Sequence, residues 1–251
     1  MARKSCKGLV GVMVMMVVAL LLELGSAQGP PQPRTIVTPR FYNRLLAAVP
    51  SRCPGKRLYT YNAFILAAES FAGFGTTGTI VTRKREMAAF LANVMHETGT
   101  YSYNFYLDDD DDRTGLCYTR EIRPQSRYCS PSARQYPCLP GRSYYGRGPL
   151  QLTWNYNYGA AGRYLSLNLL RNPDLVALDG TVSFKTAVWF WMENSRCHSG
   201  ITTGRGFGST IRAINGGECG GGRPDAVRSR VEFYLRFCRE FGVTPGPNIY
   251  C

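Results

Sequence analysis

Apolar residues recur at helical spacing in several stretches of the chain, and the clearest stripe lies between residues 82 and 99. Its members fall at i, i+3, i+4, i+7 and i+8, and they are Met87, Phe90, Leu91, Val94 and Met95. This spacing predicts an amphipathic helix that buries one face. Thr82 is expected to cap the N-terminus of this helix, and Gly99 to follow its C-terminus.

The same spacing predicts further helices, whereas alternating strand patterns are almost absent. Thr38-Pro39 has the composition of an N-cap and first helical position, and Phe41, Leu45, Leu46 and Val49 follow as the buried face. The other expected helices cover residues 61–71, about 156–165, 179–193, 207–215 and 224–241. The pattern therefore predicts a mainly helical fold with one small hairpin at most, and no internal repeat stands out.

Residues 100–143 interrupt this helical pattern, because they are rich in Tyr, Arg, Ser and Pro and contain three cysteines. A connection of this length needs either a function or covalent cross-links, and we expect both. The acidic run Asp108–Asp112 inside it is expected to be a solvated loop, since it lacks the ligand spacing of a calcium site. A role of this run in substrate binding or in the response to pH stays open.

The first 27 residues have the pattern of a secretory signal peptide. Arg3, Lys4 and Lys7 precede the apolar run Leu9–Leu22, and the small residues at 25–27 offer a cleavage site. The run is too short to span a bilayer comfortably, and nothing after residue 27 is long and apolar enough to do so. We therefore expect a secreted protein with no integral membrane segment, a Pro-rich stub over 28–37 and one domain over 38–251.

Loss of this segment lowers the formal net charge from +13 to +11 and leaves eight cysteines. On a secreted protein, the positive charge favours anionic cell walls or membrane surfaces as partners over nucleic acid. An even number of cysteines in an oxidising compartment indicates disulfides. A zinc site is disfavoured, because there is no CxxC pair and the only histidines are His96 and His198. Neither a metal nor an organic cofactor is expected.

Two carboxylates are candidates for acid/base chemistry. Glu97 lies in the last turn of the 82–99 helix at the border of the apolar stripe, where burial and the helix dipole both favour a protonated carboxyl. Glu121 lies among arginines whose guanidinium groups favour its ionised form; these are Arg120, Arg123 and Arg127. Such a pair suits acid/base cleavage of a glycosidic bond, but spacing alone does not distinguish it from two surface carboxylates.

The stretch YYGRGPLQLTWNYNYG at 144–159 alternates aromatic rings with amides and a hydroxyl. Its polar members are Gln151, Thr153, Asn155 and Asn157. Aromatic faces beside amides suit a polar but uncharged ligand such as a sugar. Taken alone, the stretch is equally well explained as a structural turn rich in Tyr and Asn.

Four motifs together resemble the plant family 19 glycoside hydrolases, the endochitinases. They are HETG at 96–99, YYGRGPLQLTWNYNYG at 144–159, FKTAVWFWM at 184–192 and GFGSTIRAINGGECG at 206–220. The resemblance extends over essentially all of residues 38–251. It implies a mainly α (α+β, lysozyme-like) fold, two-lobed and helical, with long disulfide-stapled loops around a substrate cleft. It also implies hydrolysis of β-1,4-linked N-acetylglucosamine polymers with inversion of configuration.

The resemblance also assigns roles to individual residues. Glu97 would be the general acid, Glu121 the general base, and Thr153 would help to hold the attacking water. The residues implied to line the cleft or to surround the acid are His96, Gln151, Tyr156, Asn157, Lys185, Asn215 and Arg230. The implied disulfides are Cys53–Cys117, Cys129–Cys138 and Cys219–Cys251. The pairing of Cys197 and Cys238 stays open, since Cys238 lies on an apolar stripe and could be a buried free thiol.

The chain departs from this family in lacking the N-terminal chitin-binding module of some members and in having a short segment between Trp191 and Asn215. The second departure implies fewer sugar subsites. The expected partner is chitin or its oligomers, bound by a monomer that acts in the apoplast or cell wall as a plant defence against fungi. Two alternatives remain: a related protein that binds wall polysaccharide without cleaving it, and a basic antimicrobial protein whose action on membranes fades with salt.

Overall fold

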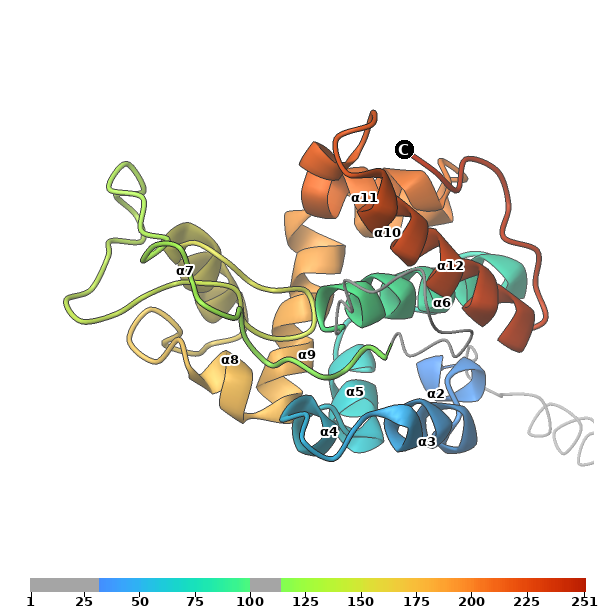
Figure 1. Cartoon of the computed structure of the whole chain (residues 1–251), viewed down its shortest axis with the longest axis horizontal. Coiled ribbons are helices and arrows are strands. Elements are labelled where there is room, and N and C mark those ends of the chain that lie inside the picture. Colours follow the sequence, from blue (N-terminus) through green and yellow to red (C-terminus); the bar gives the residue numbers. More distant parts are fainter. Residues whose placement is uncertain (1–31, 100–113) are drawn as a thin grey trace, which may run out of the picture. The chain divides into compact units, whose positions relative to one another are not determined.

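A computed structural model describes residues 32–99 and 114–251 (Figure 1). The expected signal peptide and the acidic run Asp108–Asp112 lie outside this range. Regular structure within the range is helical, and the expected hairpin is reduced to two isolated bridges, Arg120 with Arg147 and Arg147 with Leu152. The longer helices are α3 (Pro39–Ala48), α5 (Tyr61–Ala68), α6 (Ile80–Glu97), α7 (Asn155–Tyr164), α9 (Gly180–Trp189), α11 (Phe207–Asn215) and α12 (Pro224–Glu240). The predicted mainly helical fold is confirmed.

Helix α6 lies at the centre of the fold, with α12 packed along it (Figure 1). All five residues of the predicted stripe are buried. The burial is wider than one face, however, since every residue from Glu86 to His96 is buried. The N-cap differs from the prediction: Thr79 takes extended backbone and its hydroxyl accepts a hydrogen bond from the Thr82 amide at 3.2 Å, so the helix begins at Ile80. Its C-cap is Thr98, and Gly99 follows it as expected.

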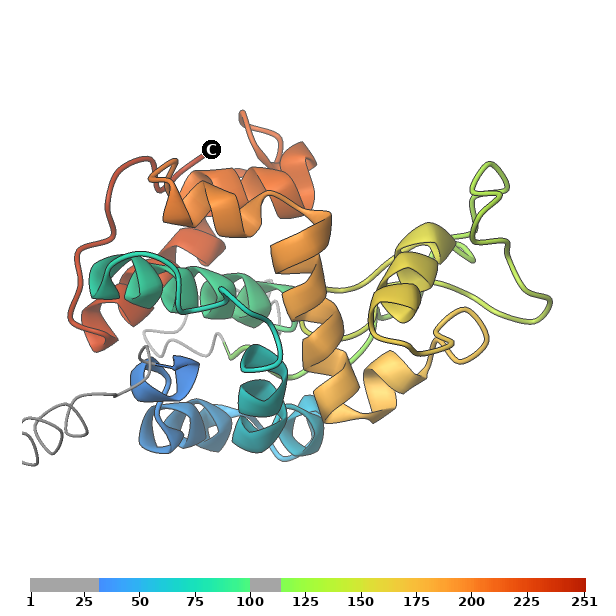
Figure 2. The same cartoon turned by 180° about the vertical axis from the view of Figure 1, so that it is seen from behind.

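Helix α9 separates two groups of elements (Figures 1 and 2). On one side lie α2 (Pro33–Ile36), α3, α4 (Gly55–Leu58), α5, α6, α10 (Cys197–Thr202), α11 and α12. On the other side lie α7, α8 (Leu175–Leu178) and most of the irregular segment 114–153, whose first residues still lie on the helical side, where Cys117 is bonded to Cys53. We call these the helical side and the loop side. They correspond to the two lobes that the sequence predicts.

The loop side is hydrogen-bonded to the end of α6 through Thr98. The amide of Leu116 donates to Thr98 Oγ1 at 2.7 Å, and the amides of Cys117 and Tyr118 both donate to its carbonyl at 3.0 Å. A Cβ at Gly115 would lie 2.4 Å from Met95 Cα, so only glycine allows this close approach. The chain therefore returns directly to the helix end that carries Glu97 before it reaches Glu121.

Three disulfides connect loops to the rest of the fold, and they are the pairs that the resemblance implied: Cys53–Cys117, Cys129–Cys138 and Cys219–Cys251. The first closes a span of 64 residues and ties the segment before Glu121 to the helical side. Cys197 and Cys238 are free and buried. Burial raises the pKa of the Cys197 thiol to about 12 and that of Cys238 to about 11, so neither is a reactive thiolate at neutral pH.

Several helix bounds differ from the sequence prediction. Helix α5 ends at Ala68 rather than near residue 71, and the expected helix over 179–193 divides into α9, capped by Asp179, and the π-helix η1 (Phe190–Asn194). The short helices α2, α4, α8 and α10 and the 3₁₀ turn η2 (Gly216–Glu218) were not predicted, and α2 falls within the expected Pro-rich stub. One-turn helices carry too few residues for a periodic pattern. Helix α11 has the predicted bounds.

Candidate active site

Glu97 ends α6 beside a buried guanidinium from α12. Arg230 Nη2 donates to Glu97 Oε1 at 2.5 Å, Nε donates to Glu218 Oε2 at 2.9 Å, and Nη1 donates to Asn93 Oδ1 at 3.0 Å. Arg230 is 0% exposed, whereas the Glu97 side chain is 17% exposed. The guanidinium thus fixes one oxygen of a carboxylate that still reaches the surface. The fold therefore brings Arg230 into contact with Glu97.

The charges of this cluster depend on one another. Burial by itself would lower the pKa of Arg230, but Glu97 and Glu218 raise it above its ordinary value, so the guanidinium stays charged. Burial, together with the positive charges of Arg230 and Arg223, lowers the pKa of His96 to about 2. His96 is therefore neutral at physiological pH, and its 3.9 Å approach to Glu218 is not an ion pair.

Two more residues complete the cluster. Asn215, at the end of α11, donates from Nδ2 to Glu218 Oε1 at 2.9 Å, and His96 Nδ1 lies 3.1 Å from Ser229 Oγ. Glu218 and Asn93 are site residues that the sequence reasoning missed. The available signals were a lone carboxylate three residues after Asn215 in a glycine-rich stretch, and an amide within an otherwise apolar helix.

Glu121 lies in an irregular segment and is held by a hydroxyl and the backbone. Tyr128 Oη donates to Glu121 Oε1 at 2.7 Å, and the Gly146 amide donates to Oε2 at 3.3 Å. The Glu121 amide in turn donates to the Gly146 carbonyl at 2.7 Å. The expected arginine surroundings are not found: within 32–99 and 114–251, no guanidinium forms an ion pair with Glu121. Arg127 donates instead to the Arg142 carbonyl at 2.8 Å.

Arg147 anchors the loop that carries the predicted sugar-binding residues. It is 2% exposed, and its Nη2 donates to Asp174 Oδ1 at 2.7 Å. Its Nη1 donates to Tyr158 Oη at 2.9 Å, and its guanidinium carbon lies 3.6 Å from the centre of the Tyr145 ring. A buried arginine within the GRG motif thus joins this loop to α7 and to the turn before α8.

The candidate ligand groups of this loop are fixed by hydrogen bonds to its own backbone. Gln151 has φ +47 and donates from Nε2 to the Gly148 carbonyl at 2.8 Å. The Thr153 hydroxyl donates to the Gln151 carbonyl at 2.6 Å, and Asn157 Nδ2 donates to the Thr153 carbonyl at 2.9 Å. Of these three predicted residues, Gln151 and Thr153 thus lie in the turn before α7, and Asn157 lies in the first turn of that helix.

Asn155 belongs to the fold rather than to a ligand surface, which corrects its grouping with the sugar-binding amides. It is fully buried, and its side chain bonds to the backbone of Ser130 and to the carbonyl of Tyr136. By contrast, Trp154 and Tyr156 are 37% and 39% exposed and stack with ring centres 6.0 Å apart. These two rings are the aromatic surface that this stretch offers.

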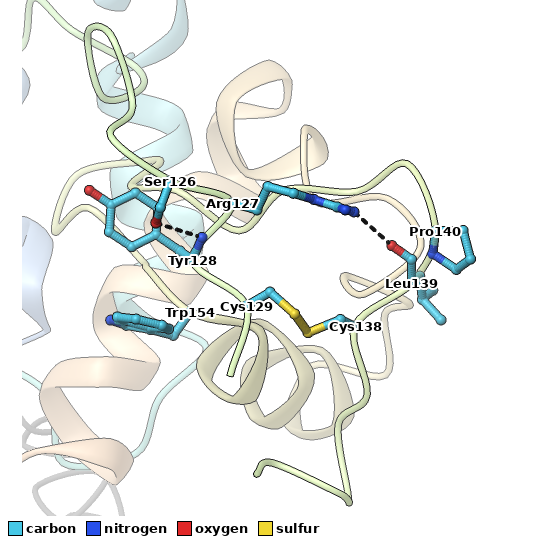
Figure 3. Close-up of a pocket in the computed structure, with 8 residues that line it drawn as sticks. All are labelled: Ser126, Arg127, Tyr128, Cys129, Cys138, Leu139, Pro140 and Trp154. Carbon is cyan, nitrogen blue, oxygen red and sulfur yellow. Dashed lines mark hydrogen bonds between the residues drawn. A yellow bond between two sulfur atoms is a disulfide. The ribbon is translucent and has the colours of Figure 1, made fainter. Parts of the chain in front are cut away.

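A pocket of about 480 Å³ lies beside this surface (Figure 3). Its walls are Ser126, Arg127, Tyr128, Cys129, Cys138, Leu139, Pro140 and Trp154. Figure 3 shows the Cys129–Cys138 bridge between the two arms of the loop, with Arg127 reaching across to the Leu139 carbonyl. Tyr128 belongs both to this pocket and to Glu121. Sequence reasoning missed it, although it directly precedes Cys129 in the same cysteine-bounded segment as Glu121.

Lys185 is the predicted site residue with the weakest structural link to the others. It is half-buried on α9 and forms no hydrogen bond or ion pair with another described residue.

Within the described ranges, no group of three or more His, Cys, Asp or Glu side chains has a metal-binding arrangement. In the same ranges, no helix is long and apolar enough to cross a membrane.

Comparison with known proteins gives a consistent result. The family described as "Chitinase class I" matches residues 36–251. An endochitinase of Arabidopsis thaliana is 52% identical over 217 residues, which is 86% of this chain and 68% of that protein. Chitinase 4 of Oryza sativa subsp. japonica is 48% identical over 219 residues, 86% of this chain and 70% of that protein.

Comparison with solved structures also finds chitinases. The crystal structure of a family 19, class IV chitinase from Zea mays has a TM-score of 0.75 at 44% identity and covers 86% of this chain and 98% of that one. Chitinase C from Streptomyces griseus has a TM-score of 0.73 at 38% identity and covers 90% and 100% of the two chains. With its motifs, helical fold and disulfides in agreement, the chain belongs to the family 19 glycoside hydrolases, the class I chitinase family.

Proposed function

We propose that this protein is a secreted endochitinase that hydrolyses β-1,4 linkages between N-acetylglucosamine units with inversion of configuration. Glu97 acts as the general acid, Glu121 as the general base, and Thr153 positions the attacking water. The observation that carries the proposal is that the fold brings together two carboxylates with different partners, Glu97 bound to a buried guanidinium and Glu121 bound to a hydroxyl and a backbone amide. The Thr98 hydrogen bonds to Leu116, Cys117 and Tyr118 bring the segment before Glu121 to the helix end that bears Glu97.

The charge balance around Glu97 suits a group that gives and takes one proton. Glu97 and Glu218 bring two negative charges to the single guanidinium of Arg230, while His96 stays neutral. A proton on Glu97 therefore leaves the cluster with no net charge, and its transfer to the leaving oxygen restores the charge that Arg230 stabilises. Glu97 is the member of the cluster that reaches the surface, so it is the one that meets the substrate.

The loop side supplies the base and the polar contacts. A carboxylate that accepts hydrogen bonds from Tyr128 and Gly146 is oriented to take a proton from a water molecule. The Thr153 hydroxyl, on the turn that follows Gly146, supports that water. The exposed Trp154 and Tyr156 rings offer flat faces for the sugar rings, and Gln151 and Asn157 offer amides.

The proposal includes secretion and a cell-wall target. The apolar run over 9–22, with basic residues before it, supports export, and the net charge of +11 that remains without residues 1–27 supports attraction to anionic wall material. The natural substrate would be chitin of fungal walls, in a role of plant defence.

Product analysis tests the reaction. The protein is incubated with N-acetylglucosamine hexamer, and the products are followed by anomer-resolved proton NMR. We expect internal cleavage and the α-anomer first, because water attacks the face opposite the leaving group. Glu97→Gln should lower kcat by about 10²–10⁴-fold and leave hexamer binding intact. Glu240→Gln, an exposed carboxylate that pairs with Arg44, is the matched control and should be fully active.

Three results would contradict the proposal at different levels. The β-anomer as first product would exclude inversion but leave the substrate assignment. Glu97→Gln with more than about a tenth of the wild-type rate would exclude Glu97 as the acid. Binding of the hexamer with no cleavage by the wild type would favour the alternative, a polysaccharide-binding protein.

A further inference from the structure

Tyr128 forms a side-chain hydrogen bond to the proposed base. Its hydroxyl donates to Glu121 Oε1 at 2.7 Å, while the Gly146 amide reaches Oε2 at 3.3 Å. The two carboxylate oxygens thus have different partners, and the shorter contact comes from a side chain. Removing the tyrosine hydroxyl would leave Glu121 with a single, longer backbone contact among the described residues.

The backbone at Tyr128 is strained in order to make this contact. Its φ is +49, a left-handed conformation that is uncommon for a bulky residue and costs free energy. Two bonds stabilise it: the Tyr128 amide donates to Ser126 Oγ at 3.0 Å, and its carbonyl accepts from the Asn155 amide at 3.2 Å. Strain of this kind persists where the surroundings hold it in place, and here it directs a hydroxyl at a carboxylate.

Three neighbouring contacts restrict the position of Tyr128. Cys129, the next residue, is bonded to Cys138. The buried Asn155 side chain fixes Ser130 and Tyr136 inside that loop. The Tyr128 ring meets Trp154 edge-on with centres 5.5 Å apart, and Figure 3 shows both rings on the same side of the pocket.

The Tyr128 hydroxyl also stays protonated. Its hydrogen bond to Glu121 is the main cause that raises its pKa, and burial and the charge of Glu121 add to this effect. Since tyrosine ordinarily ionises near pH 10, the group is a hydrogen-bond donor throughout the range in which a carboxylate base works.

The geometry points to Tyr128 as a positioning residue for catalysis, which holds the Glu121 carboxylate in orientation through its hydroxyl. This inference rests on the proposed function, because it needs Glu121 to be the base. It also explains the role of the Cys129–Cys138 loop. This loop and Asn155 hold the strained backbone of Tyr128, and the Tyr128 hydroxyl in turn orients Glu121.

The test compares Tyr128→Phe with Tyr136→Phe. Tyr136 lies in the same disulfide loop, and its hydroxyl forms no hydrogen bond with another described residue, so its variant controls for loss of a phenol from this loop. For Tyr128→Phe we expect kcat about tenfold lower with KM unchanged, because the base loses the donor that orients it. Tyr136→Phe should match the wild type in both.

A double-mutant cycle separates positioning from folding. In a Glu121→Gln background, Tyr128→Phe should cause no further loss of the residual rate, because there is no carboxylate left to hold. A merely structural tyrosine would lower the rate by the same factor in both backgrounds, and that result would overturn the inference. So would wild-type kcat in Tyr128→Phe.

The same cycle distinguishes this inference from the proposed function. If Glu121→Gln keeps most of the wild-type rate, then the assignment of the base fails, and the role of Tyr128 fails with it. If Glu121→Gln is nearly inactive while Tyr128→Phe behaves like Tyr136→Phe, then only the inference about Tyr128 fails.

Discussion

Glu97 stands at the end of a helix whose final eleven positions before it are buried, whereas Glu121 stands in a segment with no regular secondary structure. The first carboxylate is held by ion pairs in the interior, with Arg230 shared between Glu97 and Glu218. The second is half-buried and is held by a tyrosine hydroxyl and a backbone amide. Helices α6 and α12 and the 3₁₀ turn η2 bring the first set together, while the second set comes from loops, one of them closed by a disulfide.

The two regions should therefore differ in how much of the fold is lost when one of these contacts is removed. On the helical side, a lost partner leaves a charge in the interior that water cannot reach, so the site and the fold should fail together. On the loop side, Glu121 and Tyr128 are half-buried, and the segment is held by the Cys129–Cys138 disulfide and by hydrogen bonds between Asn155 and the backbone. Loss of one of these should open the loop and leave the helices in place.

The largest effect on stability is expected for Arg230→Met. The change leaves Glu97, Glu218 and the amide of Asn93 without their shared donor, and breaking a buried pair in this way typically costs about 3–5 kcal/mol. Urea unfolding measures it. Arg228→Met is the matched control two positions earlier on α12, since Arg228 is 52% exposed and its ion pair among the described residues is with the exposed Asp225; its cost should stay within about 0.5 kcal/mol. Equal stability of the two variants would contradict the comparison.

An intermediate effect is expected for Cys129→Ser combined with Cys138→Ser. The bridge closes nine residues, for which loop-closure entropy gives about 2–3 kcal/mol. We expect the damage to be local: trypsin should cut the native variant at the exposed Arg134 and Arg142, while the helices stay protected. The pair Cys219→Ser and Cys251→Ser, at the C-terminus, is the control and should leave cleavage at those arginines unchanged. Cutting first within α6 or α12 would show that the loop side does not open by itself.

The smallest effect is a pH dependence of the unfolding free energy that arises from Glu86 in α6 and its partner His198. His198 Nδ1 lies 2.6 Å from Glu86 Oε1, and this hydrogen bond raises the pKa of His198 despite partial burial, with Glu193 adding to the effect. A folded-state pKa above the unfolded value means that the pair stabilises the fold below about pH 6.5 and loses this contribution as pH rises through the raised pKa. The difference in unfolding free energy between the wild type and His198→Gln should therefore shrink from pH 6 to pH 8. A difference that grows over this range would contradict the assignment.

The local elements were largely predictable from the sequence, because their causes lie within a few residues. Thr38-Pro39 begins α3 as expected, with the Thr38 side chain accepting from the Phe41 amide, and α11 covers the predicted residues. The three-residue shift of the α6 cap from Thr82 to Thr79 reflects two equivalent capping residues one turn apart. Sequence offers no means of choosing between them, because either hydroxyl can accept an amide hydrogen bond.

The candidate site was predictable only in part. Glu97, Glu121 and Arg230 were identified, but the partners of Glu121 were expected to be arginines close in sequence. The arginines carry long side chains that reach other acceptors: Arg127 bonds to the Arg142 carbonyl. A segment without periodic structure gives no rule for where a side chain points. The sequence therefore could not show that Tyr128 is the residue that donates to Glu121.

What the sequence determined by itself was the longer helices, the candidate carboxylates and, through its motifs, the family. Each of these depends on short-range spacing or on runs of residues that can be compared directly. What only the tertiary structure decided was the set of partners: Glu218 and Asn93 around Arg230, Tyr128 on Glu121, and the buried place of Asn155. Those contacts join residues from 7 to 137 positions apart, and which of them form depends on how the helices and cross-linked loops pack.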